Sequence, residues 1–226
     1  MNYTTLLFDV DDTLLDFKKN EQVAFATLFQ KLNLPLTTDI FARYQEINHK
    51  LWSEFEHGLI SKDQVIHTRF RKLAEEFQLD YSNQPVEEWY QNELANGAFM
   101  MDGAYELCEK FSKTHRMYIV TNGIATTQYK RLKDSKLDQF FQQIFVSEEI
   151  GYQKPAKEFF DYVLEHIPDA RKEDMLIIGD SLASDIKGGV LAGIDTCLIQ
   201  RETKVVEGSI QPKFYIKMLE ELEPIV

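Results

Sequence analysis

Short apolar runs recur along the chain, and stretches with helical spacing separate most of them. The first run, "TTLLFDV", is followed at once by acidic residues, which predicts a buried strand that ends near Val10. Similar runs follow in "MYIVT", "QIFVS", "MLIIGD" and "DTCLI". Helical patterns lie between the runs at 104–111, 127–132, 159–164 and 186–191. Strands that alternate with helices in this way are typical of a parallel sheet covered on both faces.

The stretch over residues 18–98 differs, because it contains no strand-like apolar run. Apolar residues repeat there at helical spacing, as in Phe25, Leu28, Phe29 and Leu32. We therefore predict an α/β fold with two domains. A Rossmann-like parallel-sheet core over residues 1–17 and 99–226 is interrupted after its first strand by a helical domain over residues 18–98.

Composition and charge narrow the possible partners. Hydrophobic residues make up 44% of the chain and charged residues 27%, as in an ordinary soluble protein. The formal net charge of −12 repels polyanions, so nucleic acid and anionic membranes are poor partners. No apolar run approaches the roughly 18 to 20 residues that are needed to cross a bilayer. The N-terminal stretch "MNYTTLLFDVDD" has acidic residues where a signal peptide would be apolar. We expect a cytoplasmic protein, and a phosphate-bearing ligand requires local positive charge in its site.

Four polar clusters lie at the ends of predicted strands or beside them: "DVDDT", "TNG", "QKP" and "GDSLASD". Active sites gather at the carboxyl ends of parallel strands. Asp9 and Asp11 are alternate residues, so their carboxylates lean toward the same side while the backbone stays extended. Two like charges this close raise a pKa unless a cation offsets them. Asp180 and Asp185 add carboxylates at another strand end, and such oxygen ligands favour magnesium.

In this order, the four clusters resemble the motifs of the haloacid dehalogenase-like hydrolase superfamily, specifically of its aspartate-nucleophile phosphatases. The matching stretches are "DVDDTLLDF", "IVTNG", Lys154 of "QKP" and "GDSLASD". The long helical insertion resembles the helical cap domain of the superfamily. Further stretches resemble the pyrimidine 5'-nucleotidase branch of YjjG/YfnB type, namely "KLWSEFEHGLIS", "FVSEEIGYQKP" and "IIGDSLASDIKGG". This resemblance implies a phosphatase for UMP, dUMP, dTMP and non-standard relatives.

The resemblance also implies chemical roles for individual residues. Asp9 is expected to attack phosphorus and form an aspartyl phosphate. Asp11 is expected to protonate the leaving oxygen and then to take a proton from the attacking water. Thr121, the backbone amide of Asn122 and the amine of Lys154 are expected to bind the phosphoryl oxygens.

The resemblance further implies a magnesium site made from the same strand ends. Asp9 and Asp180 are expected to ligate the ion, and the backbone carbonyl of Asp11 is expected to face it. Asp185 is expected either to ligate the ion or to orient a water bound to it. A helix N-cap is the alternative role for Asp185.

The choice of substrate is expected to reside in residues 18–98, where the chemical signal is weak. Trp52, Phe55, Phe70 and Trp89 could stack on a pyrimidine, although aromatic residues at helical spacing are more often part of a core. No cluster of histidines suggests a metal site in this stretch.

Three other functions compete with the nucleotidase. A sugar-phosphate phosphatase, a phosphomutase or another small-metabolite phosphatase uses the same core motifs. A haloacid dehalogenase is disfavoured, because displacement at carbon needs neither the acid at Asp11 nor the metal pocket at Asp180. A phosphoacceptor signalling domain combines similar residues, but its acid pair and acceptor precede the Thr and Lys, whereas "GDSLASD" follows Lys154.

Overall fold

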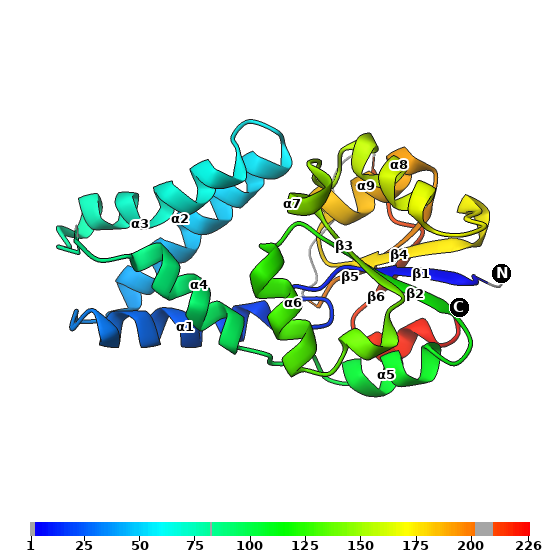
Figure 1. Cartoon of the computed structure of the whole chain (residues 1–226), viewed down its shortest axis with the longest axis horizontal. Helices are drawn as coiled ribbons and strands as arrows, with labels where there is room; N and C mark the ends of the chain where they lie inside the picture. Colours follow the sequence, from blue (N-terminus) through cyan, green and yellow to red (C-terminus); the bar gives the residue numbers. More distant parts are fainter. Residues whose placement is uncertain (1–2, 82, 202–209) are drawn as a thin grey trace. The chain divides into compact units, whose positions relative to one another are not determined.

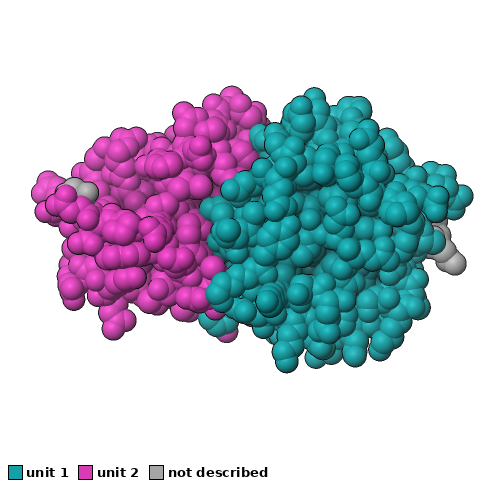
Figure 2. Space-filling view, in the orientation of Figure 1, with its two compact units in different colours: residues 1–17, 98–226 teal, residues 18–97 magenta. Residues whose placement is uncertain are grey.

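The chain folds into two compact units. The structure is a computed structural model that describes residues 3–81, 83–201 and 210–226. Met1–Phe17 and Ala98–Val226 form unit 1, and Lys18–Gly97 form unit 2 (Figure 2). Unit 2 ends one residue before the predicted end of the insertion, because Ala98 groups with unit 1.

Unit 1 is built on one parallel sheet, with six strands among the described residues. Its strands are β1 (Thr5–Phe8), β2 (Arg116–Thr121), β3 (Gln143–Val146), β4 (Met175–Gly179), β5 (Asp195–Ile199) and β6 (Phe214–Ile216). They lie in the order β3-β2-β1-β4-β5-β6, and every neighbouring pair is parallel. This confirms the predicted α/β fold with a Rossmann-like core.

Two details of the sheet differ from the sequence prediction. β1 ends at Phe8, two residues before the predicted end at Val10, because the chain leaves the sheet before its apolar run is over. β6 is not among the predicted strands. It has three residues, of which only Ile216 is buried, so its apolar pattern is too short to indicate a strand.

Helices cover both faces of this sheet (Figure 1). Alternate side chains of β1 point to opposite faces. Leu6 and Phe8 join one core with residues of the helices Ala104–Phe111 and Ala125–Asp134. Leu7 joins a second core with residues of the helices Lys157–His166 and Lys187–Ala192. The helices of unit 1 are α5 (Ala104–Phe111), α6 (Ala125–Asp134), α7 (Ser147–Ile150), α8 (Lys157–His166) and α9 (Lys187–Ala192). Shorter helical turns lie at Asp138–Phe140, Lys172–Asp174, Leu182–Ile186 and Leu219–Leu222.

Unit 2 consists of helices. They are α1 (Phe17–Lys31), α2 (Thr38–Glu56), α3 (Lys62–Phe77) and α4 (Val86–Asn96), and α1 begins on the last residue of unit 1. Ser61 starts α3 with a capping box, in which its hydroxyl and the side chain of Gln64 each bind the other's backbone amide. Across the described residues, no helix has both the length and the apolar character of a membrane span.

An aromatic core joins the helices of unit 2. At its centre lie four rings that come from four different helices, namely Phe25, Tyr44, Phe70 and Tyr90. The ring centroids of Phe25 and Tyr44 are 4.5 Å apart, and those of Tyr44 and Phe70 are 5.2 Å apart. Phe55 is also buried. Phe55 and Phe70 therefore belong to the interior of unit 2, the more common fate of aromatic residues at helical spacing.

Candidate active site

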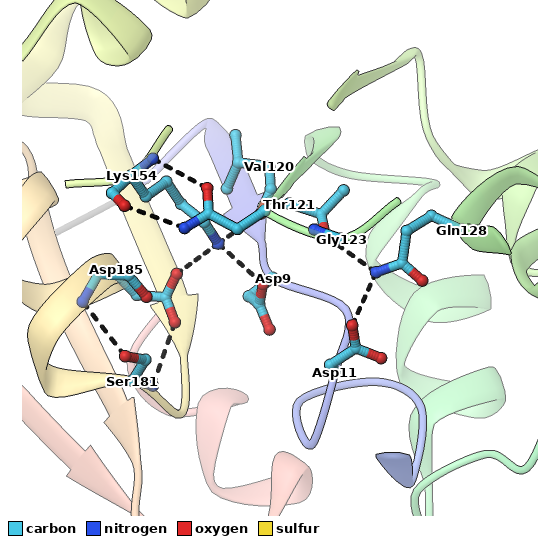
Figure 3. A network of polar contacts seen from close by, with 11 residues as sticks. Asp9, Asp11, Val120, Thr121, Gly123, Gln128, Lys154, Ser181 and Asp185 are labelled. Carbon is cyan, nitrogen blue, oxygen red and sulfur yellow. Dashed lines mark hydrogen bonds and ion pairs between the residues drawn. The ribbon is translucent and has the colours of Figure 1, made fainter. Parts of the chain in front are cut away.

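A buried lysine organises the carboxyl ends of the central strands. The amine of Lys154 donates hydrogen bonds to Asp9 Oδ1 at 2.8 Å, to Asp185 Oδ1 at 2.6 Å and to the carbonyl of Val120 at 2.7 Å (Figure 3). Its side chain is 1% exposed. An ammonium group has three donors, so these three acceptors fix its position completely.

The backbone around Lys154 is held by Asn122, which follows β2. Asn122 Nδ2 donates to the carbonyl of Lys154, and the amide of Lys154 donates to Asn122 Oδ1, both at 2.9 Å. The side chain of Asn122 is thus committed to Lys154, and the phosphate role of its backbone amide stays a prediction. The sequence did not indicate this pairing, since the two residues are 32 positions apart.

Three carboxylates gather beside the amine of Lys154. Asp9 lies just beyond β1, and Asp180 follows β4 directly. Oxygen atoms of Asp9, Asp180 and Asp185 all lie within 4.8 Å of one another. The backbone amide of Ser181 donates to Asp185 Oδ2 at 3.1 Å. A Cβ at Gly179 would stand 2.2 Å from the same oxygen, so only glycine fits beneath Asp185.

The helix N-cap role for Asp185 is wrong. Ser181 caps the turn Leu182–Ile186 instead, because its hydroxyl accepts a hydrogen bond from the amide of Ser184 at 3.2 Å. Asp185 lies inside that turn, and its carboxylate points toward Lys154 (Figure 3).

The carboxylates of this site outnumber its positive charge. Burial raises the pKa of Asp9 to about 7, and the charges of Asp185 and Asp11 add to the rise, although Lys154 opposes it. Asp180 as a whole residue is exposed to solvent, but many protein atoms surround its carboxylate. This burial of the carboxylate, together with the charges of Asp9 and Asp185, raises the pKa of Asp180 as well. Burial alone would lower the pKa of Lys154, but its two ion pairs more than offset this and raise it.

This donor set suits a hard divalent cation. It offers three clustered carboxylates, and the raised pKa values of Asp9 and Asp180 mean that added positive charge would favour their ionised forms. Magnesium binds through one or two carboxylates together with water and phosphate oxygens. The residues present therefore fit a magnesium ion.

Asp11 has partners different from those of Asp9. Its Oδ1 pairs with Arg131. Its Oδ2 accepts a hydrogen bond from Gln128 Nε2 at 2.8 Å (Figure 3). Both partners lie on α6. The two carboxylates thus point toward different neighbours, although the sequence predicted that they lean to one side.

Thr121 is the last residue of β2, and its hydroxyl oxygen also meets α6. It accepts hydrogen bonds from Gln128 Nε2 at 2.9 Å and from the amide of Gly123 at 3.1 Å.

The structure thus joins Asp9, Lys154 and the acidic cluster into one group, and it joins Asp11 and Thr121 into a second group through Gln128. Sequence reasoning missed Gln128 and Arg131. The sequence shows only that these two polar residues lie three positions apart on a helix that is expected to cover the sheet.

Comparison with known proteins identifies the family. The model of the haloacid dehalogenase-like hydrolases matches residues 6–199. The chain belongs to the haloacid dehalogenase-like hydrolase family. It is 48% identical to the HAD-hydrolase YfnB of Bacillus subtilis over 224 residues, which cover 99% of this chain and 95% of YfnB.

Two further relatives of this hydrolase carry a substrate in their names. It is 37% identical over 197 residues to the pyrimidine 5'-nucleotidase PynA of Streptococcus pneumoniae, covering 87% of this chain and 83% of PynA. It is 30% identical over 226 residues to the pyrimidine 5'-nucleotidase YjjG of Escherichia coli, covering 100% and 99%. The predicted family is thereby confirmed.

A solved structure also resembles this hydrolase along its whole length. The crystal structure of YfnB bound to magnesium has a TM-score of 0.95 and covers 100% of this chain and 99% of that one. The fold of this hydrolase is therefore that of a family member for which magnesium binding has been observed.

Proposed function

We propose that this hydrolase is a magnesium-dependent phosphatase that acts on nucleoside 5'-monophosphates, preferentially pyrimidine nucleotides, through an aspartyl phosphate at Asp9. The observation that carries the proposal is the buried Asp9 carboxylate, which shares the ammonium of Lys154 with Asp185 and also lies close to Asp180. Such an arrangement disfavours a bound anion unless a cation comes with it. A phosphate ester with magnesium supplies that pairing.

In the first half of the reaction, a carboxylate oxygen of Asp9 attacks phosphorus and the bond from phosphorus to the ester oxygen breaks. The ester oxygen leaves with the electron pair and takes a proton from Asp11. Lys154 holds Asp9 in place through its hydrogen bond of 2.8 Å. The fixed ammonium stabilises the negative charge that develops on the transferring group without having to reorganise.

In the second half, water attacks the phosphorus of the aspartyl phosphate and gives a proton to Asp11. The bond from phosphorus to Asp9 breaks, and the free carboxylate and inorganic phosphate result. Division of one difficult hydrolysis into two displacements is the usual benefit of a covalent intermediate. Asp11 thus needs a fixed position near both the leaving oxygen and the water.

Asp9 and Asp180 are the residues that would hold magnesium, and the backbone carbonyl of Asp11 would face it. Asp185 would ligate the ion or orient a water bound to it. When bound, magnesium supplies positive charge that offsets the carboxylates and polarises the phosphoryl oxygens. The support for this ion is the oxygen donor set of Asp9, Asp180 and Asp185 within 4.8 Å.

The substrate class is proposed from the two pyrimidine 5'-nucleotidases among the relatives. The phosphate contacts from unit 1 are common to all phosphate esters, so they cannot select a leaving group. We assign this selection to the helical residues of unit 2, in the role of a cap domain.

The direct test is phosphate release from a panel of esters with magnesium present. The panel contains UMP, dUMP, dTMP, AMP, GMP, glucose 6-phosphate and p-nitrophenyl phosphate, with a 2-haloacid as a control for dehalogenation. We expect the highest kcat/KM for a pyrimidine nucleotide and no halide release. A higher kcat/KM for the sugar phosphate contradicts the substrate class. A protein that releases halide but no phosphate contradicts the phosphatase itself.

A further inference from the structure

We infer that Gln128 and Arg131 are positioning residues that hold the carboxylate of Asp11 and the hydroxyl of Thr121 as one hydrogen-bonded unit. The inference rests on the proposed phosphatase function and deepens it. It assigns a place in the reaction to two side chains of α6 that do not touch the phosphate themselves.

The two side chains form a hydrogen-bonded network with Asp11. Gln128 is 1% exposed, and Arg131 is fully buried. Gln128 Nε2 donates to Asp11 Oδ2 at 2.8 Å, and Arg131 pairs with Asp11 Oδ1. Arg131 Nη1 also donates to Gln128 Oε1 at 3.0 Å, which fixes the orientation of the amide. Both oxygens of Asp11 are therefore held from one helix, and the carboxylate cannot rotate without breaking a hydrogen bond to a buried side chain.

The same amide determines which way the hydroxyl of Thr121 donates. A hydroxyl oxygen has two acceptor lone pairs and one hydrogen. Gln128 Nε2 and the amide of Gly123 occupy both lone pairs, at 2.9 Å and 3.1 Å. No described residue accepts the hydrogen of this hydroxyl, so it remains for a ligand oxygen. Gln128 thus orients the hydroxyl of Thr121 and the carboxylate of Asp11 at once.

Gly123 gives the amide of Gln128 its space. A Cβ at position 123 would lie 2.4 Å from Gln128 Nε2 and 2.7 Å from Gln128 Cγ, which is closer than real Cβ contacts. Any other residue at this position must displace Gln128 from its contacts with Asp11 and Thr121. The glycine at position 123 thus leaves room for Gln128 to make these contacts.

A purely structural role for the network leads to a different expectation. If Gln128 and Arg131 only stabilise the fold, their replacement lowers activity on every phosphate ester to the same degree. If they position Asp11, the loss depends on how much the leaving oxygen needs a proton. A nitrophenolate departs without protonation, whereas a phenolate or a ribose oxygen depends on it.

The test measures kcat/KM of Gln128→Met on two esters of similar shape, phenyl phosphate and p-nitrophenyl phosphate, with UMP as a third. Methionine nearly preserves the volume of glutamine but removes both of its hydrogen-bonding functions. We expect kcat/KM to fall about 10²-fold for phenyl phosphate and UMP, the scale of general acid catalysis, and less than about tenfold for p-nitrophenyl phosphate. The smaller loss reflects Thr121, whose contact all three esters share.

Two further variants make the result specific. In an Asp11→Asn background, Gln128→Met should reduce kcat/KM for the two aryl esters by the same factor, because no proton carrier is left to position. Gln142→Met is the matched control. Gln142 accepts a hydrogen bond from the hydroxyl of Tyr118 at 2.7 Å outside the site, and its replacement should lower both esters equally and slightly.

Equal losses for both aryl esters in Gln128→Met would overturn the inference, as would a leaving-group effect that persists without Asp11. If Gln128→Met does not fold, Arg131→Met provides the same test, since methionine removes the Nη1 atom that donates to both Asp11 and Gln128. A native protein that hydrolyses none of the three esters contradicts the proposed function instead.

Discussion

Each unit of the molecule buries a network of charged side chains, but only one of the two networks is internally satisfied. In unit 2, Arg69 is 1% exposed and binds both oxygens of Glu87. It also donates to Asn48 Oδ1 at 3.1 Å, and Asn48 Nδ2 donates to Glu21 at 2.9 Å. These contacts join all four helices of unit 2. Arg69 and Glu87 thus neutralise each other, and Glu21 receives hydrogen bonds from the side-chain amides of Asn48 and Gln45.

The network of unit 1 is built from similar groups but leaves negative charge without a partner. Lys154 serves Asp9 and Asp185, whereas the carboxylate of Asp180 receives no hydrogen bond or ion pair from the described residues. Burial, together with the charges of the neighbouring carboxylates, raises the pKa of both Asp9 and Asp180. A satisfied network stabilises a fold. A network with excess negative charge lowers the stability of the fold and is typical of a site that binds a cation and a ligand.

The largest effect that separates the two networks is expected from Asp9→Asn. Asparagine keeps the size of the side chain and removes the nucleophilic charge, so kcat should fall by at least about 10³-fold while the protein stays folded. Phosphate release and circular dichroism measure the two outcomes. Asp195→Asn is the control, because Asp195 pairs with Lys213 away from the site. Retention of more than a few per cent of activity by Asp9→Asn, taken as an order of magnitude, removes Asp9 from its role.

Removal of magnesium should abolish activity and also lower the thermal stability. An ion that binds only the folded state at about 100 times its Kd adds about 2.7 kcal/mol to the free energy of unfolding. We expect magnesium to raise the Tm of the native protein and of Arg69→Met. It should not raise the Tm of Asp180→Asn, which lacks a ligand. Full phosphatase activity in excess chelator, or an equal rise in Tm for Asp180→Asn, would contradict the metal site.

Arg69→Met tests the satisfied network. Loss of one partner leaves Glu87 without its guanidinium, and breaking a buried pair costs about 3 kcal/mol or more. Urea unfolding measures this free energy. The kcat of the folded protein on p-nitrophenyl phosphate should change less than about twofold, since the network lies outside the chemistry. Arg43→Met is the control, because Arg43 and its partner Glu76 are exposed. A loss of stability no larger than that of Arg43→Met would show that this network is not structural.

Replacement of residues 18–97 by the helical domain of a relative with another substrate should give the smallest effect. We expect the kcat/KM on p-nitrophenyl phosphate to stay within about tenfold, while the preference for UMP over AMP disappears. A competition assay with both nucleotides measures this preference. If the chimera keeps it, the residues that select the base lie in unit 1.

The sequence predicted those parts of the molecule that depend on local pattern. Asp9, Thr121 and Asp180 stand at the ends of apolar runs, so their positions at the ends of strands could be predicted from the order of residues alone. Lys154 follows a helix and a turn, and only its resemblance to a family motif singled it out. The structure then shows its amine buried among three oxygen acceptors.

The contacts that could not be predicted join residues far apart in the chain. Gln128 and Arg131 are 117 and 120 positions from Asp11. Nothing in a helical pattern says which polar face turns inward. The same holds for Arg69, since a buried arginine and an exposed one look alike in a sequence until the partner helix is in place. Hydrophobic periodicity indicates elements, whereas polar networks depend on how those elements pack.

The most direct test of the account is to find the covalent intermediate. The protein is mixed with a phosphate ester and magnesium, quenched in acid and reduced with borohydride, which converts an aspartyl phosphate to homoserine. Peptide mass spectrometry then locates the modified residue. We expect homoserine at position 9 and at no other aspartate, and no modification when the ester is omitted. Turnover of the ester without any modification at Asp9, or with modification at another aspartate, would contradict it.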